Sequence, residues 1–143
     1  METYEQKEKK SHLLRNSLLG VAGILVLALS IFIYVKFYFV WGEGVKTGQL
    51  NYVVRKGYVF KTYEGKLIQA GLKSGAMGNS IQSNEFVFSV EDENVAKQLM
   101  NAGGYEVDLQ YKEYLGTLPW RGHSKYVVDS IINLKPRQEY NSN

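Results

Sequence analysis

The hydrophobic pattern begins with one long apolar segment near the start of the chain. No charged residue occurs from Asn16 to Val35, and as a helix these 20 residues would span roughly 30 Å, the thickness of a bilayer's hydrocarbon core. A lysine and an aromatic cluster follow, as in an interfacial belt. The pattern predicts a transmembrane signal-anchor helix over residues 16–41, with Lys36, Tyr38 and Trp41 at the membrane interface.

Two other structures could account for this apolar segment. A cleaved signal peptide has a shorter apolar core and ends at small residues, which are lacking here, and a buried helix would need a larger soluble core. Four cations precede the span and only Lys36 and Lys46 closely follow it, so the positive-inside rule, which gives acidic residues little weight, predicts a cytoplasmic N-terminal arm over residues 1–15. The predicted location is the inner (cytoplasmic) membrane, with the C-terminal domain in the periplasm. The cations that set this orientation are Lys7, Lys9, Lys10 and Arg15.

Beyond the span, the polar and apolar positions alternate as in β-strands. Three glycines in residues 42–48 predict a hinge, and a tight hairpin turn is expected at Glu64-Gly65. The spacing changes to that of a short helix after the N-cap Asp92, and two further strands follow. This order predicts a mainly-β domain over 49–134, a small OB-like β-barrel of five or six strands with one short helix. A half-open β-roll is the alternative, and residues 135–143 are expected to form a polar tail.

Charge changes the interpretation of this domain very little. The net charge of +3 and the pI of 9.0 suggest nucleic acid, but residues 1–15, 16–41 and 42–143 carry +1 each. A nucleic-acid surface needs a dominant basic stripe, so nucleic acid is not the expected partner. Within the outer domain the charge runs +4, −5 and +2 along residues 42–84, 85–113 and 114–143, which favours contact with another envelope protein.

Catalytic patterns are missing from the sequence. The glycine clusters lack the spacing of a dinucleotide fingerprint, and the absence of cysteine excludes a thiol nucleophile or a cysteine-ligated metal. Nothing in the sequence brings Glu64 to Glu113 or Asp108 as an acid–base pair, or places Ser124 and Asp129 around a histidine as a triad. We therefore expect no catalytic, cofactor or metal site. An envelope enzyme acting on a glycan or nucleotide is the alternative.

Two short segments carry the chemistry that suits a binding partner. One packs charged, hydroxyl and aromatic groups together from Lys61 to Leu67, and the other places a tryptophan and an arginine in the loop from Pro119 to His123. Turn chemistry or packing of the barrel end would explain the same residues. In the membrane, the pair Gly20 and Gly23 leaves a homo-oligomer as an open alternative, because small residues allow close helix contact. The candidate partner-binding residues are Lys61, Thr62, Glu64, Trp120, Arg121 and His123.

These segments also carry a resemblance. The run Phe60-Lys61-Thr62-Tyr63-Glu64-Gly65-Lys66-Leu67, the strand Phe86–Val90 and the stretch Pro119-Trp120-Arg121-Gly122 resemble a family of small bacterial envelope proteins of Bacteroidetes type. The resemblance covers nearly all of residues 42–134 and implies a single membrane span followed by an OB-like β domain, without an established activity. Some members bear the name 6-phosphogluconate dehydrogenase. This sequence contradicts that activity, which requires a Rossmann domain and a much longer chain.

Overall fold

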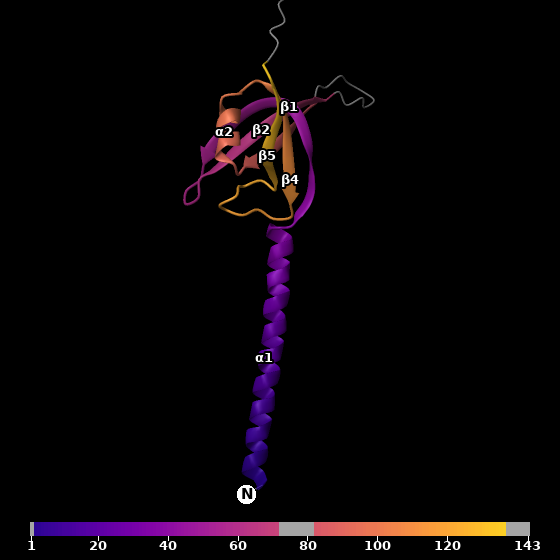
Figure 1. The fold of residues 1–143 in the computed structure, drawn as a ribbon, viewed down its shortest axis with the longest axis vertical. Coiled ribbons are helices and arrows are strands. Elements are labelled where there is room, and N and C mark those ends of the chain that lie inside the picture. Colours follow the sequence, from indigo (N-terminus) through magenta and orange to yellow (C-terminus); the bar gives the residue numbers. More distant parts are fainter. Residues whose placement is uncertain (1, 72–81, 137–143) are drawn as a thin grey trace, which may run out of the picture. The chain divides into compact units, whose positions relative to one another are not determined.

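The computed structural model describes residues 2–71 and 82–136. Its internal contacts divide the chain between Tyr38 and Phe39 into two compact units. The first unit holds one long helix, and the second holds a β-sheet with one short helix (Figure 1). The parts predicted as a loop at 72–81 and as a tail at 137–143 lie outside the described residues.

The first unit consists of the helix α1, Glu2–Phe37. Its stretch from His12 to Phe37 is 26 residues long, and none of it is buried within the chain. At about 1.5 Å per residue this stretch reaches about 39 Å, which exceeds the roughly 30 Å of a bilayer core. The chain therefore has an N-terminal helix long and apolar enough to span a membrane. This helix ends before the predicted boundary at 41, because the chain turns at Tyr38 and Trp41 already belongs to a strand.

Aromatic side chains and a lysine gather at the end of α1. The rings of Tyr34 and Tyr38 stack with 6.4 Å between their centroids. The Lys36 Nζ lies 5.6 Å from the ring centroid of Phe32 and 5.4 Å from that of Phe37. A cation is favourable in the last turn of a helix, where the carbonyl groups lack partners. Two of the three predicted interface residues, Lys36 and Tyr38, therefore each contact aromatic rings at the end of α1.

The second unit is a closed sheet of five strands in the order β1-β2-β3-β5-β4, with β4 returning to β1. All neighbours are antiparallel except β3 and β5, which pair only at Ser89–Val127 and Val90–Val128. Because the sheet closes, the alternative of a half-open β-roll is wrong. The elements are β1 (Val40–Lys56), β2 (Thr62–Gly71), β3 (Gln82–Val90), α2 (Glu93–Met100), β4 (Glu106–Tyr114) and β5 (Tyr126–Lys135).

The predicted hinge over residues 42–48 is wrong, because these residues form the first half of β1. This long strand curves around the sheet, pairing first with β4 and then with β2 (Figure 1). A Cβ on Gly44 would lie 3.2 Å from the Tyr111 hydroxyl, and one on Gly48 would lie 3.0 Å from the Ile68 carbonyl oxygen. Glycine is needed here because neighbouring groups approach the backbone closely.

The predicted hairpin turn at Glu64-Gly65 is also wrong, since β2 runs straight through both residues. The reversal between β1 and β2 occurs earlier, in the loop 57–61, where Gly57 has φ of +141°. Gly65 instead lies opposite Phe88, and a Cβ there would come within 2.3 Å of that ring. Gly65 thus provides space for an aromatic ring of the core.

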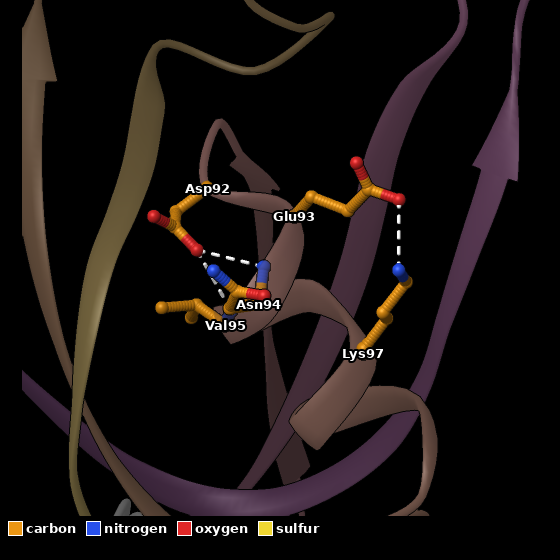
Figure 2. Close-up of polar contacts among 5 residues, drawn as sticks. All are labelled: Asp92, Glu93, Asn94, Val95 and Lys97. Carbon is orange, nitrogen blue, oxygen red and sulfur yellow. Dashed lines mark hydrogen bonds and ion pairs between the residues drawn. The ribbon is translucent and has the colours of Figure 1, made fainter.

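The core lies inside the sheet and beneath α2. The predicted cap is confirmed: the Asp92 side chain accepts hydrogen bonds from the backbone N–H groups of Asn94 and Val95 (Figure 2). One face of α2 is buried, through Ala96 and Leu99. An aromatic group within the sheet, Phe86, Phe88, Tyr111 and Tyr126, adds ring contacts at centroid distances of 5.1 to 6.0 Å. The principal buried aliphatic residues are Leu50, Val53, Leu67, Val90, Val107, Leu109 and Val128.

Candidate functional site

The fold brings the two predicted binding segments together. The first lies in the loop 57–61 and the start of β2, and the second in the loop 115–125 between β4 and β5. A hydrogen bond joins them across 59 positions of sequence, from the His123 backbone N–H to Glu64 Oε1 at 3.0 Å. The loop 115–125 therefore crosses the outer face of β2 and β3, near the end where the loop 57–61 emerges.

Glu64 is the centre of this contact. Its side chain is only 3% exposed, although a carboxylate is costly to bury unless hydrogen bonds replace its water. Thr62 Oγ1 donates to Oε1 at 2.8 Å, and Ser89 Oγ donates to Oε2 at 2.7 Å. With the His123 N–H, three donors from two strands and one loop hold the carboxylate. We call Thr62, Glu64, Ser89 and the His123 backbone the Glu64 clamp.

Serine side chains extend the clamp along the loop. Ser89 Oγ accepts a hydrogen bond from the Ser124 N–H at 3.0 Å, while Ser124 Oγ donates to the Val87 carbonyl at 2.9 Å and accepts from the Tyr126 N–H at 3.1 Å. Gly122 allows this close approach, because a Cβ there would lie 2.1 Å from Ser89 Oγ and φ is +152°. The backbone of the loop is thereby fixed against the sheet.

Arg121 supports the same loop from within. It is 6% exposed, and its Nη2 donates to the Gly116 carbonyl at 3.0 Å. Its guanidinium lies 3.6 Å from the centroid of the Tyr114 ring, which is a close cation–π contact. Arg121, Thr62 and Glu64 are therefore internal residues, and burial does not suit their predicted role as direct contacts for a partner. They position the loop 115–125 instead.

The remaining predicted residues, Lys61, Trp120 and His123, are exposed. Trp120 meets Phe60 edge to face, with 6.1 Å between the ring centroids. The sequence interpretation missed the neighbouring side chains: Tyr58 is fully exposed and Val59 is 85% exposed. Their signal was present in the sequence as a bulky apolar run after a glycine, between two lysines. We call the four exposed side chains Tyr58, Val59, Phe60 and Trp120 the aromatic rim.

An open groove lies beside the aromatic rim. Its volume is about 540 Å³, and both loops contribute to its wall. Most of the lining is apolar, while lysine and histidine provide the polar groups. The lining residues are Lys56, Gly57, Tyr58, Val59, Phe60, Pro119 and His123. The arrangement suits binding of an amphipathic surface.

A second groove of about 410 Å³ has a different character, because charged side chains of β4, β5 and the residues before α2 line it together with two valines and a tyrosine. Lys112 Nζ lies 3.0 Å from Asp129 Oδ2, and this hydrogen bond raises the pKa of Lys112 above its ordinary value. Asp92 also lines the groove but caps α2. Across residues 2–71 and 82–136, no group of three or more His, Asp or Glu side chains is placed to hold a metal ion.

The catalytic pairings considered from the sequence do not form among the described residues. Asp108 accepts a hydrogen bond from Thr47 at 2.6 Å, and Glu113 lies beside Gly42, whereas Glu64 is held by the clamp. The other acid considered, Asp129, pairs with a lysine, and the hydroxyl of Ser124 donates to a backbone carbonyl. Acid–base chemistry therefore finds no support in these contacts.

No protein family, curated protein or solved structure matches this chain. The resemblance to Bacteroidetes-type envelope proteins accordingly stays a prediction. What the site can do must be inferred from its own side chains, from the two loops that present them and from the topology of the sheet.

Proposed function

We propose that this chain is a single-span membrane protein that holds an OB-like binding or scaffold domain outside the cytoplasm, where the domain contacts another component of the cell envelope. The membrane location rests on α1 and on the cations that precede its apolar stretch. The periplasmic side follows from the positive-inside rule. The function rests chiefly on the aromatic rim and the clamp that fixes it.

The topology supports the OB-like interpretation. The sheet closes in the order β1-β2-β3-β5-β4, β1 pairs with both β2 and β4, and α2 joins β3 to β4. OB-folds are five-stranded Greek-key barrels that bind ligands with the β1–β2 and β4–β5 loops and the adjoining sheet face. In this chain those loops are 57–61 and 115–125, the same two that the Glu64 clamp joins. The location of the rim is therefore the location at which such a barrel binds.

The single observation that carries the proposal is the contrast between the inside and the outside of these loops. A buried carboxylate with three donors holds the backbone in one arrangement, while bulky apolar side chains next to it face solvent. Exposed aromatic groups on a fixed scaffold are typical of a contact surface, since they need not be ordered on binding. A loop with only a structural role would fold Tyr58 and Trp120 inward.

The alternative of an enzyme acting on a glycan or nucleotide is less well supported. Glu64, the acid considered for this enzyme, does not line the groove and already accepts three hydrogen bonds. His123 does line the groove, but a general base needs a substrate proton within reach and a defined polar partner set. Retained cellular function in the variant His123→Ala would argue against catalysis.

Location is tested by a reporter enzyme that is active only outside the cytoplasm, fused after Asn143. The proposal expects activity from this fusion, and none from a matched fusion of a reporter that is active only in the cytoplasm. The reverse pattern would refute the topology.

Contact is tested by placing a photo-crosslinking amino acid at Trp120 and, as a control, at the exposed Ile132 of β5. A discrete adduct should form in intact cells only from position 120. Equal labelling from both positions, or none from position 120, would contradict a binding role for the rim.

A further inference from the structure

We infer that the aromatic rim binds the headgroup region of an anionic lipid bilayer. This inference rests on the proposed function, because it names the envelope component that the rim contacts. It is carried by three features of the sheet unit: the side chains of the rim, the charge of the two loops, and the length of chain between β1 and α1.

The side chains of the rim have the composition of a membrane interface. Tyrosine and tryptophan prefer the headgroup level, where the ring is partly apolar and the polar atom stays hydrated. Tyr58 and Val59 stand at the tip of their loop with almost their whole surface exposed, and Phe60 and Trp120 are about half exposed against each other. Such a tip can enter a headgroup layer without any rearrangement of the core.

The two loops carry positive charge only. Residues 57–61 and 115–125 contain no aspartate or glutamate, while Lys61 and Lys125 are exposed and Lys56 immediately precedes the first loop. Lysine is depleted in the centres of protein–protein interfaces, but beside a bilayer it buries its stem and holds its ammonium among anionic headgroups. Cations combined with apolar tips therefore favour a lipid surface over a protein.

Chain length keeps a bilayer within reach of these loops. Only Tyr38 and Phe39 separate the end of α1 from the start of β1, a connection of about 11 Å at 3.8 Å for each Cα step. Val40, the first residue of β1, pairs with Tyr114, which immediately precedes the loop 115–125. Trp41 and Leu115, next to this pair, are exposed as well. Exposed apolar side chains thus occur also at the point where the sheet unit is tethered.

The lack of cysteine in the chain allows a direct test. Spin labels are attached to single cysteines introduced by Val59→Cys, Trp120→Cys and, as the control, Ile132→Cys on β5. The full-length variants are placed in nanodiscs of phosphatidylcholine alone or mixed with phosphatidylglycerol. Each label is then compared for accessibility to oxygen, which concentrates in lipid, and to a water-soluble nickel chelate.

In anionic nanodiscs, the labels at 59 and 120 should be accessible to oxygen and protected from nickel, while the label at 132 stays accessible to nickel. Each loop lysine close to an anionic membrane surface strengthens binding by about fivefold. Lys61→Gln should therefore reduce the ratio of docked to free domains by about fivefold, whereas Lys135→Gln, at the opposite end of β5, should leave the ratio unchanged.

Nickel accessibility at 59 and 120 equal to that at 132 in both types of nanodisc would overturn the inference. So would labels that become protected from both reagents only when membrane proteins are added, because the occupant would then be a protein. The reporter fusion distinguishes this failure from that of the proposed function: a cytoplasmic C-terminus refutes the location, whatever the nanodiscs show.

Discussion

Replacing Glu64 with alanine should release the loop 115–125 from the sheet. The substitution deletes a buried acceptor and leaves the Thr62 hydroxyl, the Ser89 hydroxyl and the His123 N–H without their partner. An unpaired buried polar group costs about 1–3 kcal/mol, and the carboxylate's own desolvation penalty is recovered. With three neutral donors left unpaired, these opposing terms predict a loss of about 3 kcal/mol in the free energy of unfolding.

Two milder variants keep the test valid if Glu64→Ala does not fold. Glu64→Gln retains the shape and one oxygen but presents an amide N–H₂ where one hydroxyl now donates, so we expect a smaller loss of about 1–2 kcal/mol. Thr62→Val removes a single donor with little change of volume and should cost about 1 kcal/mol. The effects of Thr62→Val and Glu64→Ala should not add, because both break the same hydrogen bond.

The assay is denaturant unfolding of the full-length protein in detergent, followed by circular dichroism of the sheet, together with hydrogen exchange at the N–H groups of His123 and Ser124. Exchange at both groups should accelerate in Glu64→Ala more than exchange within β4. Stability within about 0.5 kcal/mol of the wild type, with unchanged exchange at these two groups, would show that the carboxylate is not a clamp.

Three further predictions concern the sheet and α2. Gly65→Ala should lower the free energy of unfolding by about 1–3 kcal/mol, because its Cβ would overlap the Phe88 ring. Adding Phe88→Leu should recover part of this loss. If the losses of the two single variants simply add in the double variant, the overlap is contradicted. Asp92→Ala should lower the free energy of unfolding by about 1 kcal/mol, because it removes a cap that accepts two hydrogen bonds. Asp92→Asn should keep most of the wild-type stability, and equal losses in the two variants would exclude the cap as the cause. Because Asp129 raises the pKa of Lys112, the pair stabilises the fold below the ordinary lysine pKa, and its contribution disappears as the pH rises through the raised value. The Lys112 side chain is more than a third exposed, so the free energies of unfolding of the wild type and of Asp129→Asn should differ by less than about 1 kcal/mol at pH 7. This difference should vanish at a pH above the titration of Lys112, and a difference that does not change with pH would contradict the pairing.

The sequence was sufficient to predict a structural element where the interactions that determine it are local. The cap at Asp92 and the strand character of β4 and β5 depend on residues a few positions apart, and the structure confirms them. The glycines of β1 and Gly65 were misinterpreted as a hinge and a turn, because what requires glycine there is a group on another strand. Tyr111 and Phe88 are 67 and 23 positions away from the glycines they contact, so only the register of the sheet reveals the requirement.

The candidate site shows the same division. Side-chain chemistry singled out both segments, but it did not reveal that they meet or which of their residues face inward. A polar strand residue on the outer face of a sheet is normally solvated, so the sequence alone predicts that Glu64 lies at the surface. In the structure the loop 115–125 covers this face and buries Glu64. The same covering explains why Arg121, on the loop, is internal while its neighbour Trp120 is exposed.

The Glu64 clamp and the aromatic rim are connected through the loop 115–125, which contributes the His123 N–H to the clamp and Trp120 to the rim. An apolar residue at 64 would stabilise the sheet at lower desolvation cost, but apolar contacts are not directional. If an apolar residue at position 64 lay beneath it, the loop 115–125 could lower its free energy by turning Trp120 inward. A carboxylate that accepts from two strands and from the His123 N–H favours one orientation of the loop backbone, and in that orientation only glycine fits at position 122. The buried carboxylate therefore contributes specificity of conformation, and the fixed loop backbone keeps Trp120 at the surface.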